Sequence, residues 1–79
     1  MSDHALVAVR ERGIRAEWLQ YALSHPRVTM PDRDDPGLRH ALAPIEEFGG
    51  RVLRVVYNPA VSPPRIITAY FDRSMRGKL

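Results

Sequence analysis

The stretch RVLRVVYN, residues 51–58, decides the fold that the sequence predicts. Its β-branched and aromatic residues favour a strand, and the pair Gly49–Gly50 before it is typical of a tight hairpin turn. After the turn PAVSPP, the stretch RIITAYF at 65–71 has the same strand-like composition. Two such runs joined by a short turn predict an antiparallel pair of strands, and the rest of the chain is placed around that pair.

Before this pair, the sequence predicts two short helices and a loop. Residues 3–12 follow a capping residue and precede Gly13, which suits a helix C-terminus. Residues 16–25 carry an apolar stripe at helical spacing and stop before Pro26. The charged segment 31–38 is broken by two prolines and a glycine, so we expect a loop there.

Helices followed by strands are typical of an α+β fold, here in one domain that covers residues 1–79. We expect both N-terminal helices to pack on one face of a three- to four-stranded antiparallel sheet. Pro44 should confine the first long strand to an edge or a bulge. The expected strands cover about 40–48, 51–58 and 65–72, a short extra strand near 27–30 would be the fourth, and a basic tail covers 73–79.

The composition argues against several classes of protein. The absence of cysteine excludes a disulfide framework and a thiolate zinc site, and the three histidines lack a ligand pattern, so we expect neither a metal nor a cofactor. No apolar run is long enough to span a bilayer and the start has no basic leader, which predicts a cytoplasmic protein that does not enter a membrane. Seventy-nine residues are close to the lower limit for an unaided core, so a homodimer or another partner could help to cover apolar surface.

Charge is distributed unevenly along the chain. Residues 1–48 have a formal charge of −2, whereas residues 49–79 have a charge of +5. Eleven of the twelve cations are arginine, whose forked guanidinium suits phosphate. A GC-rich genome would explain the preference for arginine over lysine, but it would not explain where the cations lie. The basic C-terminal half therefore indicates an anionic partner.

The period of two assigns the residues of the two clear strands to opposite faces of the sheet. The face without arginine or threonine is predicted to meet the helices, and it carries Leu53, Val55, Tyr57, Ile67, Ala69 and Phe71. The other face combines polar and aliphatic residues, namely Arg54, Thr68 and Tyr70 with Val52, Val56 and Ile66. Such a mixture on an uncovered face is typical of a binding surface or an interface.

Several segments together resemble a known family. They are HALVAVRERGI near the start, Pro26, GGRVLRVVYN, and IITAYFDRSMRGKL at the end. The His-Ala opening, the Arg-Gly-Ile joint and the Thr-Ala-Tyr strand are jointly unusual. The chain resembles a family of small uncharacterised bacterial domains related to the RelE-like and BrnT-like ribonuclease toxins of toxin–antitoxin systems. The resemblance implies the same α+β fold, RNA as a ligand and an antitoxin protein as a partner.

The resemblance also implies an activity, which is metal-independent RNA cleavage by attack of a 2′-hydroxyl on the adjacent phosphate. That chemistry needs a base, cations on the phosphate and an acid at the leaving oxygen. The positions that match the family pattern supply candidate catalytic residues, which are His4, Arg54, Thr68 and Tyr70. The candidate RNA contacts are the matched or nearby cations of the chain, namely Arg12, Arg51, Arg54, Arg73, Arg76 and Lys78.

One departure from the family pattern keeps a second function open. The family usually has an arginine four residues after the opening histidine, and this chain has Ala8 there. A domain that keeps the fold without the chemistry, and uses its open sheet face for dimerisation or partner docking, is therefore the alternative. Arg54 could then simply pair across strands with Glu46 or Glu47, and His4 could be a surface or capping residue. His40 is expected at a strand start, facing the open side.

Overall fold

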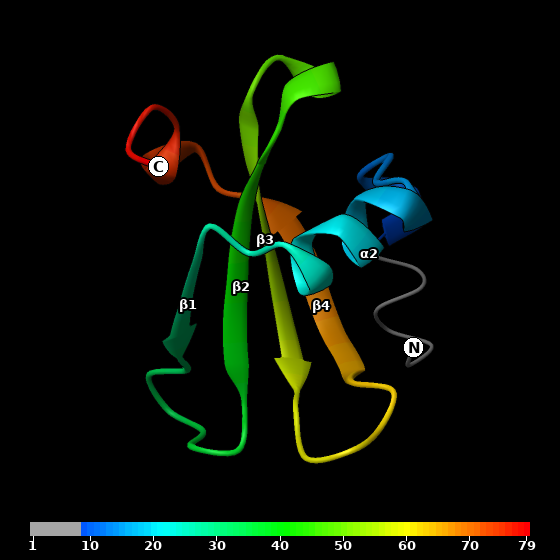
Figure 1. Cartoon of the computed structure of the whole chain (residues 1–79), viewed down its shortest axis with the longest axis vertical. Helices are drawn as coiled ribbons and strands as arrows, with labels where there is room; N and C mark the ends of the chain where they lie inside the picture. Colours follow the sequence, from blue (N-terminus) through cyan, green and yellow to red (C-terminus); the bar gives the residue numbers. More distant parts are fainter. Residues whose placement is uncertain (1–8) are drawn as a thin grey trace.

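The computed structural model describes residues 9–79, which form an α+β fold around one antiparallel sheet (Figure 1). Residues 9–11 are helical and are followed by helix α2 (Ala16–Ser24). Within this part of the chain, no helix has the length and apolar character that crossing a membrane requires. The strands are β1 (Val28–Pro31), β2 (Arg39–Ile45), β3 (Arg51–Asn58) and β4 (Arg65–Phe71), and single 3-10 turns follow β2 and β4 as η1 (Glu46–Phe48) and η2 (Arg73–Met75).

The sheet is a simple meander in which each strand pairs antiparallel with the next, in the order β1-β2-β3-β4. Helix α2 lies across one face, against β2 and β3 (Figure 1). The short strand near residues 27–30 and the helix at 16–25 are therefore present close to their predicted positions. The predicted helix at 3–12 falls mainly outside the described residues.

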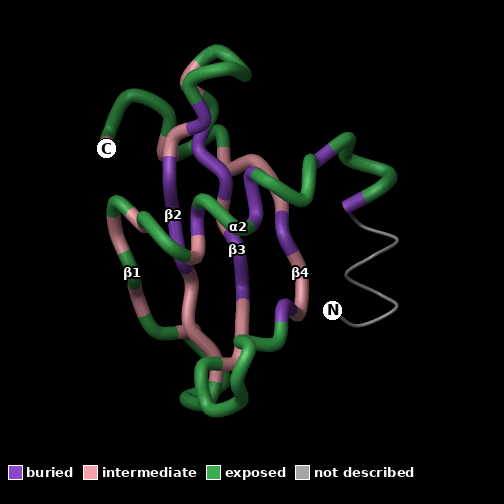
Figure 2. The backbone as a smooth tube through the Cα atoms, turned by 45° about the vertical axis from the view of Figure 1, so that its right-hand side comes forward, coloured by how far each residue is buried: buried purple, intermediate pink, exposed green. Residues whose placement is uncertain are grey.

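The core lies between α2 and the sheet, and the buried positions follow the middle of the two central strands (Figure 2). Leu53, Val55 and Ala69 are fully buried on the face that meets the helix, as the period of two predicts. Trp18 and Leu19 cover them from α2 with 6% and 2% of their surfaces exposed. Alternation along β3 and β4 thus places these three residues correctly, whereas Tyr57 and Ile67, which were expected on the same face, are not part of the core cluster.

The predicted strand at 40–48 is too long at its end. β2 stops at Ile45, and the next residues form η1 because the chain must turn through Gly49 and Gly50, whose φ angles are 71° and 75°. β2 is an inner strand, so the expectation that Pro44 confines it to a sheet edge is wrong for the strand as a whole. β1 pairs with β2 only as far as Leu42, so Pro44 has a paired neighbour on the β3 side alone.

The predicted assignment of Ile66 to the open face is also wrong. A β-bulge between Val56 and Tyr57 shifts the register, so that Val56 lies opposite Thr68 while Tyr57 lies opposite Ile66. Ile66 consequently joins the core on the helix side, with 8% of its surface exposed. The alternation of residue types along one strand does not reveal a register shift between two strands, so the sequence pattern could not predict it.

The sheet face opposite α2 is not open along its whole length. Leu42 and Val52 lie on that face and are buried, with 0% and 1% of their surfaces exposed. The segment after β4 turns back, η2 contacts β3, and the backbone N–H of Asp72 donates to the carbonyl of Val52. What the sequence presents as a basic tail is therefore a short ordered segment packed on the sheet.

Candidate functional site

Arg54 is the centre of a polar network on the face opposite α2. Its Nε and Nη2 donate to Oδ2 of Asp72 at 2.9 and 2.8 Å, and its Nη1 donates to Nδ1 of His40 at 2.8 Å. Nη1 also lies 3.7 Å from the sulfur of Met30. Only 12% of the Arg54 side chain is exposed. The guanidinium is thus largely enclosed, and all three of its nitrogens contact groups from β1, β2 or Asp72, which follows β4.

The acid that pairs with Arg54 differs from the predicted cross-strand partners. The sequence offered Glu46 or Glu47, but the hairpin tip turns both of these residues away, and Asp72 takes the place instead. The expectation that Arg54 stands ready on an uncovered face is therefore corrected by the geometry. Its first role in this structure is to neutralise a partly buried carboxylate.

Asp72 uses both carboxylate oxygens and so joins the sheet to the basic segment. Oδ2 accepts from Arg54, while Oδ1 accepts from the backbone N–H and the hydroxyl of Ser74 at 3.0 and 2.6 Å. The bonds to Ser74 cap the first turn of η2. The hydroxyl of Ser74 and, after it, the guanidinium of Arg54 hold the pKa of Asp72 below its ordinary value of 3.8.

His40 is held in one tautomer by its two neighbours. Arg54 can only donate, so Nδ1 of His40 must accept, and the ring proton lies on Nε2. Nε2 then donates to Oδ1 of Asp32 at 2.6 Å. The bond from His40 and the backbone N–H groups of Asp35 and Asp34 lower the pKa of Asp32. His40 faces the open side, as expected, but both of its nitrogens are occupied.

A basic pocket of about 280 Å³ lies beside this network. Three arginines from two segments surround it, one at the start of β3 and two in and just after η2, and Phe71 provides an apolar wall. The lining residues are Arg51, Val52, Phe71, Asp72, Arg73 and Arg76. Asp72 is the one acid among them, and its charge is already paired with Arg54. The pocket therefore presents a net positive surface around an apolar wall.

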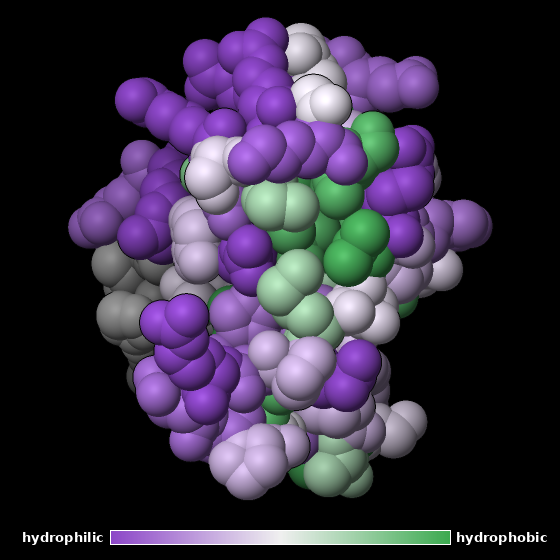
Figure 3. Space-filling view, turned by 90° about the vertical axis from the view of Figure 1, so that its left-hand side faces the viewer, coloured by the Kyte–Doolittle hydropathy of each residue, from purple (hydrophilic) through white to green (hydrophobic). Residues whose placement is uncertain are grey.

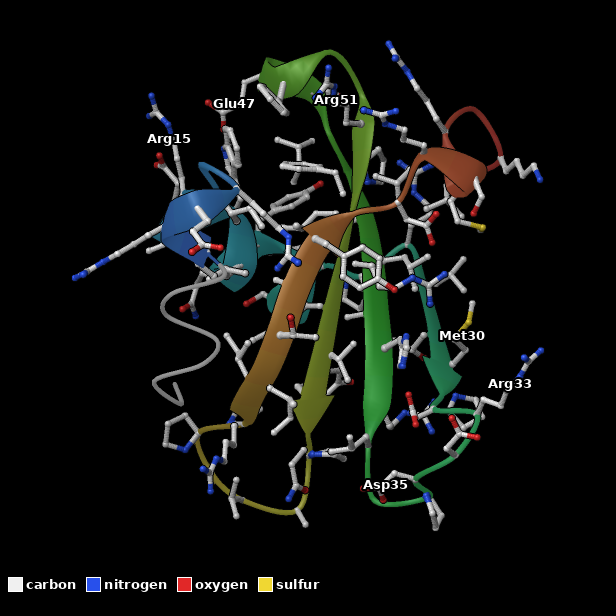
Figure 4. The ribbon with its side chains drawn as sticks, turned by 180° about the vertical axis from the view of Figure 1, so that it is seen from behind. Arg15, Met30, Arg33, Asp35, Glu47 and Arg51 are labelled. Atoms are coloured by element: carbon white, nitrogen blue, oxygen red, sulfur yellow. The ribbon has the colours of Figure 1, made fainter. Side chains whose placement is uncertain are left out.

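The hairpin tip positions two of these arginines. The guanidinium of Arg51 lies over the ring of Phe48, 4.7 Å from its centroid, and Phe48 in turn lies 5.0 Å from Phe71. Nη2 of Arg76 donates to the carbonyl of Gly49 at 3.3 Å. Figure 4 shows Arg51 at the same end of the molecule as η2. These contacts to the hairpin tip hold the guanidinium groups of Arg51 and Arg76 in place, although both side chains are exposed.

The other predicted site residues are spread over the molecule. Tyr70 lies opposite Arg54 in the sheet, and Thr68 lies opposite Val56, so both share the face of the network. Arg12 does not line the basic pocket, and its Nη1 donates to the carbonyl of Ala69 on β4 at 3.1 Å. His4 and Ala8 lie outside the described residues. Lys78 is exposed near the end of the chain.

A metal-dependent arrangement has little support in the described residues. Between residues 9 and 79, no group of three or more His, Cys, Asp or Glu side chains converges as metal ligands would. Asp72 is instead held by the guanidinium of Arg54 and by the N–H and O–H of Ser74, and Asp32 by the ring N–H of His40 and by backbone N–H groups. The network holds η2 in place through Asp72. The pocket, with its three arginines, has the chemistry to bind an anion.

The lowered pKa of Asp72 predicts that the protein loses stability in acid. A carboxyl group with a depressed pKa stabilises the fold above the unfolded-state value and loses that contribution as pH falls through the folded-state value. The free energy of unfolding should therefore fall below the ordinary pKa of 3.8, and Asp72→Asn should flatten that fall. Urea titrations between about pH 5 and pH 2 measure both slopes. If the free energy of unfolding fell equally steeply with pH in the wild type and in Asp72→Asn, the Asp72 carboxylate would not be stabilising the fold.

Comparison with known proteins gives one result. The model of the family described as "Domain of unknown function (DUF4258)" matches residues 1–71 of the chain. No match is found among curated proteins or among solved structures.

Proposed function

Because the chain belongs to the DUF4258 family, whose description assigns no activity, we propose from its geometry that it binds single-stranded RNA through the basic pocket. The observation that carries this proposal is the convergence of Arg51, Arg73 and Arg76 around Phe71. Guanidinium groups bind phosphate in a forked geometry, and an aromatic wall beside them suits an unstacked base. The resemblance to RelE-like and BrnT-like toxins supports RNA as the nucleic acid.

The size and charge of the pocket suit one segment of a nucleic-acid backbone. At about 280 Å³, it lies just below the range of roughly 300–1,000 Å³ that encloses drug-sized ligands. Single-stranded RNA can place a phosphate or a splayed base into such a space, whereas a duplex keeps its bases stacked. Lys78, which is exposed two residues beyond Arg76, would extend the favourable field along the strand.

Binding is better supported than cleavage by the residues that the structure describes. Near the pocket, Asp72 has both oxygens engaged and His40 has both nitrogens engaged, so neither is an open general base. Arg54 is similarly committed to Asp72. Endonuclease activity, which the resemblance implies, would have to depend on His4 or on Tyr70. The proposed function is therefore RNA binding, with cleavage as a separable addition.

The alternative of partner docking through the open sheet face has weaker support. The aliphatic side chains that would make that face adhesive, Leu42 and Val52, are already buried. The polar network around Arg54 lies on the same face. Figure 3 shows the molecule from the side on which β1 lies, where a group of hydrophobic residues is surrounded by hydrophilic ones.

Removing the three pocket arginines should abolish most of the RNA affinity. We expect the combined variant Arg51→Gln, Arg73→Gln, Arg76→Gln to bind a labelled single-stranded RNA of about twelve nucleotides roughly 100-fold more weakly than the wild type. Fluorescence anisotropy at about 0.1 M salt measures this. The loss follows from three charge-assisted contacts that water cannot replace in full.

A matched control separates the pocket from net charge. Arg10, Arg33 and Arg65 are exposed, lie elsewhere, and make no side-chain hydrogen bond with the described residues. Their combined replacement by glutamine removes the same charge and should weaken binding less than about fivefold. Equal losses of affinity in both triple variants would show that the pocket is not the RNA site.

Denaturing gels of the same samples, made in the presence of a chelator, would show RNA cleavage if the chain has that activity. A His4→Ala variant would then test whether His4 is the general base.

A further inference from the structure

A second and larger pocket lies on the other side of the hairpin tip, between α2 and the end of β2. Its volume is about 420 Å³, and it belongs neither to the network around Arg54 nor to the basic pocket. The lining residues come from α2, β2 and η1, and are Glu17, Trp18, Tyr21, Pro44, Ile45, Glu46 and Glu47. We call it the acidic pocket, because three of these residues are glutamates and none is a cation.

Aromatic and apolar groups form the body of the acidic pocket. Tyr21 has 46% of its surface exposed, which is high for a large ring, and one side of the ring stacks on His25 at 5.4 Å. Trp18 is 6% exposed, so it contributes an edge to the pocket rather than a free face. The pocket is thus a preformed recess beside a half-exposed ring that is already supported from behind.

The carboxylates of the acidic pocket are held in different ways. Oε1 of Glu47 accepts the indole N–H of Trp18 at 2.7 Å, which fixes this carboxylate against the aromatic edge. Glu46 is exposed, and its carboxylate makes no hydrogen bond with the described residues. Figure 4 places Glu47 at the end of the molecule where Arg15 also lies. One carboxylate is therefore oriented in advance, and another can move to meet a ligand.

A guanidinium of this chain already makes such contacts at the rim. Arg15 lies over the ring of Trp18, 5.8 Å from its centroid, and its Nη1 contacts Oε1 of Glu17 at 3.2 Å. Arg15 is not part of the pocket lining, and two thirds of its side chain are exposed, so it leaves the recess itself unfilled. The pocket itself offers the same two chemical features, namely the ring of Tyr21 and the carboxylates of Glu46 and Glu47.

We propose that the acidic pocket receives an arginine side chain from a segment of a partner protein. The argument is charge complementarity, since a chain of net charge +3 lines one aromatic recess with three carboxylates and no cation. Arg15 at the rim contacts one of these carboxylates, that of Glu17, and leaves those of Glu46 and Glu47 without a cation among the described residues. A planar guanidinium stacks on Tyr21 and forks onto a carboxylate at once, which an ammonium cannot do. A divalent ion does not fit, because these carboxylates do not converge as a metal-binding group among the described residues.

The test uses the single tryptophan of the chain as its reporter. The probe is a short glycine–serine peptide with one central arginine, and its control has citrulline, the neutral isostere of arginine, at that position. The nitrogen–proton resonance of the Trp18 indole, which is bonded to Glu47, is followed by NMR during the titration. We expect the arginine peptide to shift this resonance with a dissociation constant of about 1 mM or below and the citrulline peptide to leave it in place.

Paired variants decide whether the carboxylates are responsible. Glu17 and Glu46 are exposed, so Glu17→Gln with Glu46→Gln should fold normally and weaken the arginine peptide about tenfold. The control pair Glu11→Gln with Asp34→Asn removes the same charge from exposed positions outside the pocket and should change nothing. An equal response to citrulline, or equal affinities in the two paired variants, would overturn the proposal.

Ultracentrifugation separates a partner protein from a second copy of this chain. If the wild type alone associates in a concentration-dependent manner, and the Glu17→Gln, Glu46→Gln variant stays monomeric, the occupant belongs to another copy of this chain and the partner proposal is overturned. A wild type that stays monomeric and still binds the arginine peptide supports it. RNA enters none of these measurements, so their outcome is independent of the function proposed for the basic pocket.

Discussion

Replacing Arg54 by leucine is expected to lower the free energy of unfolding by about 3 kcal/mol. The substitution leaves Asp72 as a carboxylate without its cation, with only 14% of its side chain exposed, and it leaves Nδ1 of His40 without a donor. The loss is dominated by the partner groups left unpaired, since an intact buried ion pair contributes little net stability. Urea unfolding followed by Trp18 fluorescence measures the change.

Two further variants test whether the effect of Arg54→Leu comes from the ion pair with Asp72. Arg65→Leu, at an exposed position at the start of β4, should change stability by less than about 0.5 kcal/mol. The double variant Arg54→Leu, Asp72→Leu should recover part of the loss, because it removes both members of the pair. An Arg54→Leu protein within about 1 kcal/mol of the wild type would show that the network does not stabilise the fold.

Replacing Trp18 by alanine is expected to cost about 4 kcal/mol, which approaches the whole stability of a domain of this size. Trp18 joins α2 to the hairpin tip: its ring lies 5.3 Å from Phe48 and 6.0 Å from Phe71, and its indole N–H binds Glu47. Its removal opens a cavity in the acidic pocket, which Trp18 lines, and takes away a neighbour of Phe71 in the basic pocket. Far-ultraviolet circular dichroism during thermal unfolding is the appropriate measurement, since the variant lacks the fluorescent reporter.

Trp18→Phe distinguishes packing from the hydrogen bond to Glu47. Phenylalanine keeps an aromatic ring in the cluster with Phe48 and Phe71 but cannot donate to the carboxylate. We expect it to lose about 1–2 kcal/mol, less than half of the alanine effect. If both variants were equally unstable, the hydrogen bond rather than the aromatic cluster would hold the tip in place.

Alternation and turn residues were sufficient to predict most of the fold. The glycine pair fixed the position of the hairpin, and the period of two placed Leu53, Val55 and Ala69 in the core. The same pattern could not reveal the bulge that leaves Ile67 of β4 without a partner between Val56 and Tyr57, because a bulge depends on pairing between strands rather than on one strand's composition. Ile66 was assigned to the wrong face for that reason.

The site was only partly predictable, because its contacts join segments far apart in the sequence. The pattern brought Arg54, Thr68 and Tyr70 to one face, as the register of β3 and β4 has them. It could not show that Asp72 would pair with Arg54, or that Asp32 and His40 would extend the chain of bonds. The one available signal was Asp72 itself, the single acid in a basic half, next to the end of a strand.

The network and the basic pocket are physically coupled through Asp72. One oxygen of its carboxylate is bound to Arg54 in the sheet and the other caps η2, which carries Arg73 and leads into Arg76. The ion pair therefore fixes where the pocket arginines lie relative to Arg51. The partly buried pair of Arg54 and Asp72 thus holds the guanidinium groups of Arg73 and Arg76 in position before a ligand binds.

The salt dependence of RNA binding tests the central claim most directly. Three phosphate contacts to a single strand should give a slope of about −2 in a plot of log Kobs against log salt concentration, because each contact releases condensed counterions. The Arg51→Gln, Arg73→Gln, Arg76→Gln variant should bring that slope close to zero, while the control triple variant of Arg10, Arg33 and Arg65 keeps it. A wild-type slope near zero, or the same slope in both variants, would contradict an RNA site at the basic pocket.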